Sequence, residues 1–421
     1  MLQIRQQRFL DNLSRQSQFG RLPKSEGGGI DRRAFSTEER AVRQYFCQQA
    51  EKASLGIAID AAANLSARYP SADPDARTLL LGSHLDSVPN GGSYDGALGV
   101  WAALEVLSTL AESKIDLPVH LEAVAFTDEE GRLGDLFGSR ALTGGHTTET
   151  IEAFLKQAAE FPDDFEAMRR TVPGALTPEA IRTARRSPQS LAGFLELHIE
   201  QGPQLEKAGC QIGVVDSIFG RRSLQVQFFG RSDHAGTTPL HLRADALVAA
   251  AHFITMAPEI LQQQFPNCVL TCGNVLVRHG AYNVVPAETA VWVEFRASSE
   301  DVLQQIEKAL DRLAGNITAA PDLSFAIHPK DQLTPAAMDD SVQGQIRQVA
   351  QELGYPAMTL SSGALHDAKL MASITPTGMI FVPSKEGRSH SPAEDTESED
   401  LVAGANVLLH TVLRLCSRSK A

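Results

Sequence analysis

Hydrophobic and polar positions follow two patterns in the first half of the chain, one typical of buried strands and one typical of helices. Short apolar runs such as "TLLLGSH" (78–84) and "AGFLELHIEQGP" (192–203) predict buried strands. The stretch "GALGVWAALEVLSTLAES" (96–113) is long enough for a helix, and further helices are predicted over 40–52 and 398–416. Helices and strands in alternation predict an α/β layer structure.

The order of predicted helices and strands differs between residues 215 and 327. The predicted order there is strand, helix, strand, strand, helix, which is typical of a small α+β sandwich with its helices on one face. The elements are expected over 223–230, 243–265, 268–277, 289–299 and 300–315. Because a buried strand follows near Met379, we interpret 215–327 as a domain inserted into a larger one formed by 1–214 and 328–421.

The segment 144–190 carries no motif that indicates a function. Its charged stretch over 151–187 is interrupted by prolines and predicts surface helices placed before the next strand.

Composition restricts the classes of protein that fit. A chain of 421 residues, 43% hydrophobic and 21% charged, is typical of a soluble protein with two domains. A formal charge of −13 disfavours nucleic acid and anionic membranes as main partners. The first twenty residues have the pattern of neither a signal peptide nor a membrane span. The five scattered cysteines, with Cys268 and Cys272 too far apart for a CxxC pair, predict reduced thiols in a cytoplasm.

Ionisable side chains occur where the predicted strands end. His84 closes one apolar run, Glu129 and Glu130 follow another, and His390 follows a third, while His198 lies within a fourth. Ligands of open α/β sheets bind beyond the carboxyl ends of the strands, so these side chains are expected to converge on one crevice.

With Asp95, which lies in the glycine-rich turn after His84, the group becomes a mixed imidazole and carboxylate cluster. Such a set favours zinc, manganese or cobalt over calcium. The two oxygens of Asp95 could bridge two ions, and Asp86 is placed to accept the other ring N–H of His84. Taken singly, each feature also fits a structural role, since a lone strand histidine and a "DEEG" loop are common in proteins without a metal.

Eight motifs, in order between about residue 80 and residue 396, resemble the hydantoinase/carbamoylase group of metal-dependent amidohydrolases. These motifs are "GSHLDSVPNGGSYDGALGV", "FTDEEG…GSRAL", "ELHIEQGPQLE", "GRSDHAGTTPL…RADAL", "NVVP", "EFR", "SGALHDA" and "SHSPAEDT". The group includes N-carbamoyl-L-amino-acid hydrolases, allantoate amidohydrolases and β-ureidopropionases, within the superfamily of aminoacylases and di-zinc exopeptidases. The resemblance implies a di-zinc exopeptidase-like catalytic domain, a mixed sheet flanked by helices, with an inserted lid and dimerisation domain.

The resemblance also implies two divalent metal ions (Zn, Mn or Co) per subunit. His84, Asp95 and His198 would hold one ion, and Asp95, Glu130 and His390 the other. Glu129 matches the family's general base, which takes a proton from the attacking water and delivers it to the leaving nitrogen. The reversed assignment, with Glu130 as base and Glu129 as ligand, is compatible with the spacing alone.

Five further residues would bind the substrate if the resemblance extends to them. His234 would donate to the reacting carbonyl oxygen, often in a neighbouring subunit's site, although it could also be a polar residue at a helix start. Arg296 and Asn283 would hold a substrate carboxylate, although a strand-end arginine is as often a surface ion pair. Gln201 would contact the ureido group, and Gly363 would offer its backbone N–H.

Other residues of the same motifs are interpreted differently. His366 and Asp367 fit a supporting pair better than metal ligands. Leu365 and Ser391 depart from the family pattern at places near the pocket, which bears on the substrate rather than on the chemistry.

The expected activity is hydrolysis of an N-carbamoyl-L-amino acid to the amino acid, carbon dioxide and ammonia, by a cytoplasmic homodimer. Allantoate and ureidopropionate are alternative substrates on the same scaffold. More remote alternatives are an aminoacylase or dipeptidase and a metal-binding protein without catalysis. The chain has no GxSxG motif of a serine hydrolase and no P-loop.

Overall fold

A computed structural model describes residues 1–418 of the chain, and these divide into two compact units. The first unit combines Met1–Asp216 with the segment from Met338 onward, and the second is Ser217–Ala337. The sequence placed the end of the insert at 327, which lies inside the strand β12 (Ser324–Leu333).

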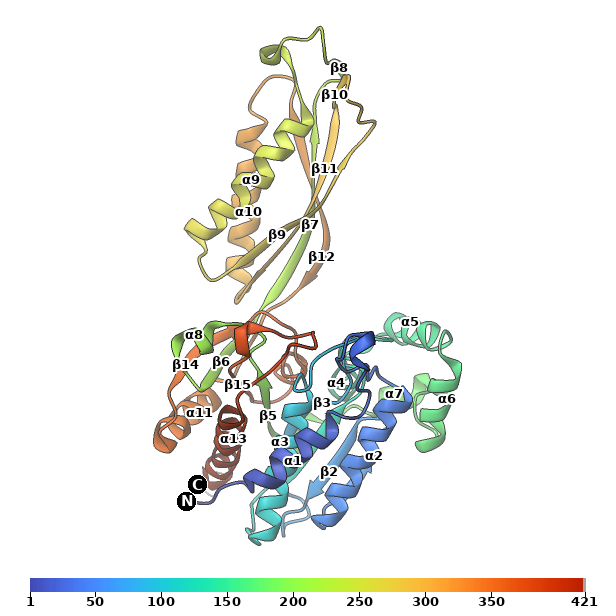
Figure 1. The fold of residues 1–421 in the computed structure, drawn as a ribbon, viewed down its shortest axis with the longest axis vertical. Coiled ribbons are helices and arrows are strands. Elements are labelled where there is room, and N and C mark those ends of the chain that lie inside the picture. Colours follow the sequence, from blue (N-terminus) through green and yellow to red (C-terminus); the bar gives the residue numbers. More distant parts are fainter. Residues whose placement is uncertain (419–421) are drawn as a thin grey trace. The chain divides into compact units, whose positions relative to one another are not determined.

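The first unit is built on a mixed sheet with the strand order β1-β2-β4-β3-β5-β15-β6, and β14 also pairs with β6 (Figure 1). The strands β4, β3, β5 and β15 are parallel neighbours, whereas β1, β2 and β6 pair antiparallel. Their bounds are β1 (Gly56–Ile59), β2 (Leu65–Tyr69), β3 (Thr78–His84), β4 (His120–Phe126), β5 (Leu191–Ile199), β6 (Ile212–Ile218), β14 (Ala357–Ser362) and β15 (Thr377–Val382).

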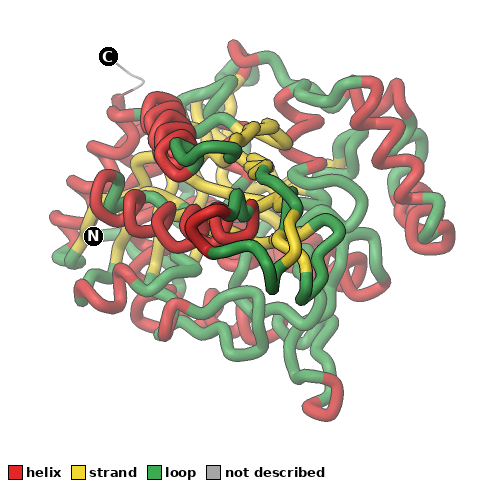
Figure 2. The backbone as a smooth tube through the Cα atoms, turned by 90° about the horizontal axis from the view of Figure 1, so that it is seen from above, coloured by secondary structure: helices red, strands yellow, loops and turns green. Residues whose placement is uncertain are grey.

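Helices pack on both faces of this sheet (Figure 1), and Figure 2 marks helices in red and strands in yellow. The helices of this unit are α1 (Gln6–Gln16), α2 (Thr37–Lys52), α3 (Ala97–Glu112), α4 (Phe137–Thr143), α5 (Thr148–Ala158), α6 (Pro162–Thr171), α7 (Pro178–Thr183), α8 (Gln204–Ala208), α11 (Asp340–Leu353), α12 (Asp367–Met371) and α13 (Ser398–Arg418). Side chains of a strand alternate between the two faces of the sheet. The face that carries Leu79 and Leu81 packs in one core with α1, α2, α3, α11 and α13. The predicted α/β class, a mixed sheet flanked by helices, is confirmed.

The sequence of β3 and α3 explains their position at the centre of the unit. Every residue of β3 is buried, as expected for a strand with parallel neighbours on both sides. The helix α3 is apolar around most of its circumference and is buried from Ala97 to Leu110. It begins at Gly96, whose φ of 62° lets the chain turn sharply from the β3 loop into the helix.

The segment 144–190 contains three short α-helices, α5 to α7, which share a small aromatic core with Phe35 and Phe137. Phe154 of α5 stacks on Phe137 with ring centroids 3.8 Å apart, and both rings are buried. Phe137 comes directly after the loop that follows β4, so the helices pack against this loop. Within residues 1–418, no helix combines the length and apolar character that a bilayer crossing requires.

The second unit is a four-stranded antiparallel sheet, β12-β7-β11-β9, with two long helices on one face (Figure 1). The strands β8 and β10 pair separately. The bounds are β7 (Gly220–Phe229), β8 (Asp233–His234), α9 (Ala246–Gln264), β9 (Val269–Val277), β10 (Val284–Val285), β11 (Glu288–Ala297), α10 (Glu300–Ile317) and, after β12, β13 (Ala336–Ala337). The strand β12 escaped sequence analysis because it is an edge strand with mostly exposed positions and an internal proline, Pro329, which blur the alternation.

Candidate functional site

The predicted ligands lie at one edge of the first unit's sheet. His84 is the last residue of β3, and His198 is the penultimate residue of β5. Glu129 and Glu130 follow β4, and His390 follows β15. Because β4, β3, β5 and β15 are parallel neighbours, their carboxyl ends share this edge, as the sequence predicts for an α/β crevice.

Asp95 presents one oxygen to the pair His84 and His198 and the other oxygen to His390. Its Oδ1 is 3.1 Å from His198 Nε2 and 3.9 Å from His84 Nε2. Its Oδ2 is 3.0 Å from His390 Nε2. The potential ligand atoms of His84, Asp95 and His198 lie within 4.8 Å of one another, as do those of Asp95, Glu130 and His390. This is the arrangement expected of a carboxylate shared between two cation sites.

The two glutamates after β4 take different neighbours. Glu129 Oε2 lies 3.6 Å from His84 Nε2, whereas Glu130 Oε1 lies 3.7 Å from His390 Nε2. The Oε1 atom of Glu130 is buried and has no hydrogen-bond partner within the part of the chain that the structure describes. A buried carboxylate oxygen without a donor is costly, and a cation beside Asp95 and His390 would satisfy it.

Asp86 contributes differently from the expectation drawn from the sequence. The backbone carbonyl of Asp86 is 3.1 Å from His84 Nδ1, while the Asp86 carboxylate is 3.7 Å from the same nitrogen. The carboxylate instead accepts the backbone N–H groups of Glu129 (3.4 Å) and Glu130 (3.1 Å). Asp86 therefore connects the turn after β3 to the loop after β4.

Burial and like charges govern the ionisation of the cluster. Burial, together with the charges of Glu130 and Asp367, raises the pKa of Glu129 well above its ordinary value. Burial and the charge of Asp95 raise the pKa of Glu130 to about 8. Burial also opposes ionisation of Asp95, but hydrogen bonds from His198 and His390 hold its pKa well below the usual value. Carboxylates crowded in this way favour a bound cation.

Gln201 and Gly363, which the sequence assigned to the substrate, also belong to the first unit. The Gln201 side chain donates through Nε2 to Asp95 Oδ2 (3.0 Å) and to Ser389 Oγ (3.2 Å), while its Oε1 is buried without a partner in the described residues. A Cβ added to Gly363 would meet no protein atom within 4 Å. Packing therefore does not require glycine at 363.

His366 and Asp367 lie beneath the cluster. The His366 ring packs edge-on against His198, with centroids 4.5 Å apart, and its Nε2 is 2.8 Å from Ser362 Oγ. Burial and the charge of Glu196 raise the pKa of Asp367 well above its ordinary value. His366 therefore contacts the potential ligand His198, and with Glu196 and His198 it forms a further group of potential metal ligands. The interpretation of His366 and Asp367 as a supporting pair stays a prediction.

His234, Asn283 and Arg296 belong to the second unit. His234 pairs with Val284 through β8 and β10, and the Asn283 carbonyl accepts the N–H of Ala235 (3.1 Å). His234 Nδ1 accepts the N–H of Gly236 (3.0 Å), so a neutral ring carries its proton on Nε2. Arg296 donates through Nε to Glu294 Oε1 (2.8 Å) on the same strand.

Sequence reasoning missed Glu394, although the motif "SHSPAEDT" contains it. Glu394 is 6% exposed and hydrogen-bonds the loop that carries Asp95. Only a pattern of covariation between residues 300 positions apart could have indicated this contact in the sequence.

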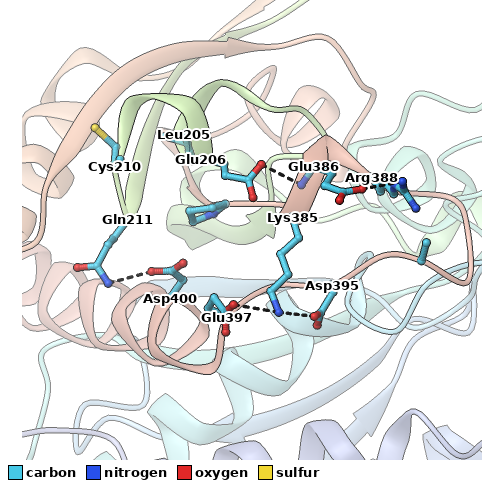
Figure 3. A pocket seen from close by; sticks show the side chains of 13 residues that line it. Leu205, Glu206, Cys210, Gln211, Lys385, Glu386, Arg388, Asp395, Glu397 and Asp400 are labelled. Atoms are coloured by element: carbon cyan, nitrogen blue, oxygen red, sulfur yellow. Dashed lines mark hydrogen bonds and ion pairs between the residues drawn. The ribbon is translucent and has the colours of Figure 1, made fainter.

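A cavity of about 620 Å³ is lined by residues that flank His390 in the sequence, among them Arg388 and Asp395 (Figure 3). Lys385 pairs there with Asp395 and with Glu397 (3.0 Å), and Gln211 donates to Asp400 (2.8 Å). None of the residues that the sequence assigned to the site lines this cavity.

Comparisons with known proteins agree on one family. The model of peptidase family M20/M25/M40 matches residues 80–414. The N-carbamoyl-L-amino acid amidohydrolase of Geobacillus stearothermophilus is 38% identical over 401 residues, which cover 94% of this chain and 96% of that protein. The allantoate amidohydrolase of Escherichia coli is 33% identical, with 93% of each chain covered. The crystal structure of a hydantoinase/carbamoylase family amidase from Burkholderia multivorans matches with a TM-score of 0.85 at 31% identity, covering 99% of this chain and 98% of that one.

Proposed function

The chain belongs to peptidase family M20/M25/M40, and from this premise we propose that it is a dimetal amidohydrolase of the hydantoinase/carbamoylase group. It hydrolyses the C–N bond of the N-carbamoyl group of an N-carbamoyl-L-amino acid, releasing the amino acid, carbon dioxide and ammonia. The observation that carries this proposal is Asp95, whose two oxygens face separate groups of potential ligands beside Glu129.

The donor set fits transition ions. His84, Asp95 and His198 would hold one ion, and Asp95, Glu130 and His390 the second, with zinc, manganese and cobalt all compatible with imidazole and carboxylate ligands. The unpartnered Oε1 of Glu130 supports this fit. When bound, such ions polarise the scissile carbonyl group and activate water.

Glu129 is the general base of the proposed reaction. Its carboxylate lies beside His84 at 3.6 Å, and it belongs to no group of potential ligands that contains Asp95. It takes a proton from the attacking water and returns it to the leaving nitrogen, which departs as neutral ammonia.

The proposed substrate-binding residues are the five that the sequence indicates. The buried, unpartnered Oε1 of Gln201 supports its assignment to the N–H groups of the ureido moiety. His234 donates through Nε2 to the developing oxyanion, a role supported by the bond from Gly236 to its other nitrogen. Arg296 and Asn283 bind the substrate carboxylate, for which the planar guanidinium supplies two parallel donors. The backbone N–H of Gly363 completes the set, and the open space beside its Cα supports close approach of a ligand.

The functional form is a homodimer that assembles through the second unit. The strand β9 is an edge of its sheet, and its apolar side chains Val269 (54%), Val275 (46%) and Leu276 (45%) are exposed. An exposed apolar edge strand favours pairing with another chain. The five cysteines are free thiols, which supports a cytoplasmic location, and the charge of −13 supports neither nucleic acid nor an anionic membrane as partner.

The decisive experiment measures ammonia release after metal removal and reconstitution with zinc, manganese or cobalt. The substrates are N-carbamoyl-L-amino acids, their D-enantiomers, allantoate, ureidopropionate and N-acetyl-L-amino acids, the last scored by amino acid release. We expect metal-dependent turnover with a preference for N-carbamoyl-L-amino acids. A preference for allantoate or ureidopropionate would replace the substrate within the same chemistry. Preferential cleavage of N-acetyl compounds, or full activity of the metal-free protein, would overturn the proposal.

A further inference from the structure

Glu394 is a buried carboxylate that contacts two separate segments of the candidate metal site. Its Oε1 accepts the backbone N–H of Tyr94 (2.8 Å) and that of Asp95 (3.2 Å). Its Oε2 accepts the hydroxyl of Ser389 (2.8 Å), the residue before His390. One side chain thus connects the backbone of Asp95 with the neighbour of His390.

The loop around Asp95 is shaped to receive this carboxylate. A Cβ added to Gly92 would lie 2.0 Å from the Glu394 carboxylate, which is closer than any side chain can approach. Gly92 therefore allows a contact that alanine would exclude, and the backbone of the loop packs directly on Glu394.

The His390 loop needs such a connection. At its base, Lys385 pairs with Asp395 (Figure 3), and the Lys385 N–H donates to the Asp395 carbonyl (2.9 Å). Nearer the tip, His390 has a φ of 53° and a side chain that is 51% exposed. The Ser389 hydroxyl is therefore an inner anchor for a residue that packing alone holds weakly.

Stability alone does not account for an acidic residue at this position. Glu394 is 6% exposed and lies close to a second carboxylate, Asp95, and burying two like charges together costs free energy. Its three hydrogen bonds offset this cost, and each of them ends on a segment that carries a potential ligand.

We propose that Glu394 is a positioning residue of the metal centre, which couples the placement of Asp95 to that of His390. The inference rests on the proposed function, because it assumes that Asp95 and His390 bind metal. Glu394 itself binds neither metal nor substrate. It limits the movement of two ligand-bearing segments that are far apart in the sequence, since Asp95 and Ser389 are separated by 294 positions.

The test compares the wild type with Glu394→Ala, Glu394→Gln and the control Glu397→Gln. Glu397 lies on the same segment, and its side chain is 61% exposed. Within the described residues, its carboxylate forms an ion pair with Lys385 alone. Metal-free proteins are titrated with Zn²⁺ against a competing chelator, which reports the number of ions bound and their affinities. Hydrogen exchange of the Tyr94 and Asp95 amides, measured without metal, reports the loss of the anchor.

For Glu394→Ala we expect an affinity for at least one ion about 10–100-fold weaker, the usual effect of removing a group that orients ligands. Exchange of the two amides should be faster. With saturating metal, kcat should fall while KM stays near the wild-type value. Glu394→Gln, which keeps one acceptor oxygen, should show a smaller effect, and Glu397→Gln none.

Wild-type affinities for both ions in a folded Glu394→Ala protein would overturn the inference. If that variant does not fold, Gly92→Ala is used in its place, because the added methyl group displaces the Glu394 carboxylate without removing it. Unchanged ion affinities in Gly92→Ala would also overturn the inference. A wild-type protein that binds no ion would overturn the proposed function, and this inference with it.

Discussion

Asp95 and Glu129 are both buried carboxylates, yet their surroundings drive their pKa values in opposite directions. Burial disfavours ionisation of both, but hydrogen bonds from His198 and His390 hold the pKa of Asp95 well below its ordinary value. Glu129 has carboxylates as its nearest charges, so its pKa is raised well above. Asp95 therefore ionises more readily than either Glu129 or Glu130, whose pKa values are both raised.

Replacing Glu129 by glutamine should abolish proton transfer while leaving the potential ligands in place. We expect kcat to fall by about 10²–10⁴-fold, the usual contribution of general acid–base catalysis. Ammonia release and metal content measured on the same preparation check this prediction. Full turnover by the variant would show that another group is the base.

Gly96→Ala tests how closely the turn after β3 fits the His84 ring. A Cβ at Gly96 would lie 2.3 Å from the imidazole, and the backbone there (φ 62°, ψ −49°) lies outside the regions that L residues ordinarily adopt. We expect weaker metal binding, measured by competition with a chelator. Gly209→Ala is a control for a positive φ without the steric contact, because its φ is 64°, its ψ of 28° lies near the αL region, and its Cβ would meet nothing within 4 Å.

At the scale of elements, the helical segment before β5 has a structural role that its sequence did not indicate. Its core stacks on Phe137, and Arg186 at its end forms two hydrogen bonds with Glu122 of β4, at 2.8 Å and 2.5 Å. The Glu122 side chain is 1% exposed. The segment thus supports β4, the strand that leads to Glu129 and Glu130.

Arg186→Met should destabilise the protein by about 3 kcal/mol, near the lower limit for a broken buried pair, because Arg68 still lies 3.5 Å from Glu122. Burial opposes ionisation of Glu122, but Arg186 lowers its pKa below the ordinary 4.5. The stabilisation is therefore present above pH 4.5 and is lost as the pH falls through the lowered pKa. Denaturant unfolding of both proteins at neutral pH and near pH 4 should show the difference shrinking. A difference that does not depend on pH would contradict this explanation.

At the scale of the whole molecule, the chain forms two compact units with different sheets. The first has a parallel centre covered by helices, which is suited to a crevice at the strand ends. The second is antiparallel with helices on one face. Its strand β9 lies at an edge of the sheet and carries exposed apolar side chains. The proposed homodimer assigns that edge to subunit contact.

Leu276→Lys should therefore convert the dimer to monomers, because it places a charge on an edge that pairing would bury. Sedimentation velocity at several concentrations checks this prediction. Ile57→Lys is the control, since Ile57 is also exposed (37%) on an edge strand but lies in the first unit. Dissociation by the control alone would move the contact to β1.

The sequence by itself predicted the α/β class, the strand that ends at His84 and the residue types at the carboxyl ends of the parallel strands. These features depend on local periodicity and side-chain chemistry, which are readable within ten or twenty residues. It also indicated an inserted unit, but not β12, whose exposed positions weaken the pattern.

Only the tertiary structure decided how the residues of the site support one another. It determined which oxygen of Asp95 faces which histidine, that the Asp86 carboxylate holds the backbone of Glu129 and Glu130, and that Glu394 anchors two segments. These contacts join parts of the chain from tens to hundreds of residues apart and depend on backbone direction. No local pattern encodes them, because each exists only once the sheet has assembled.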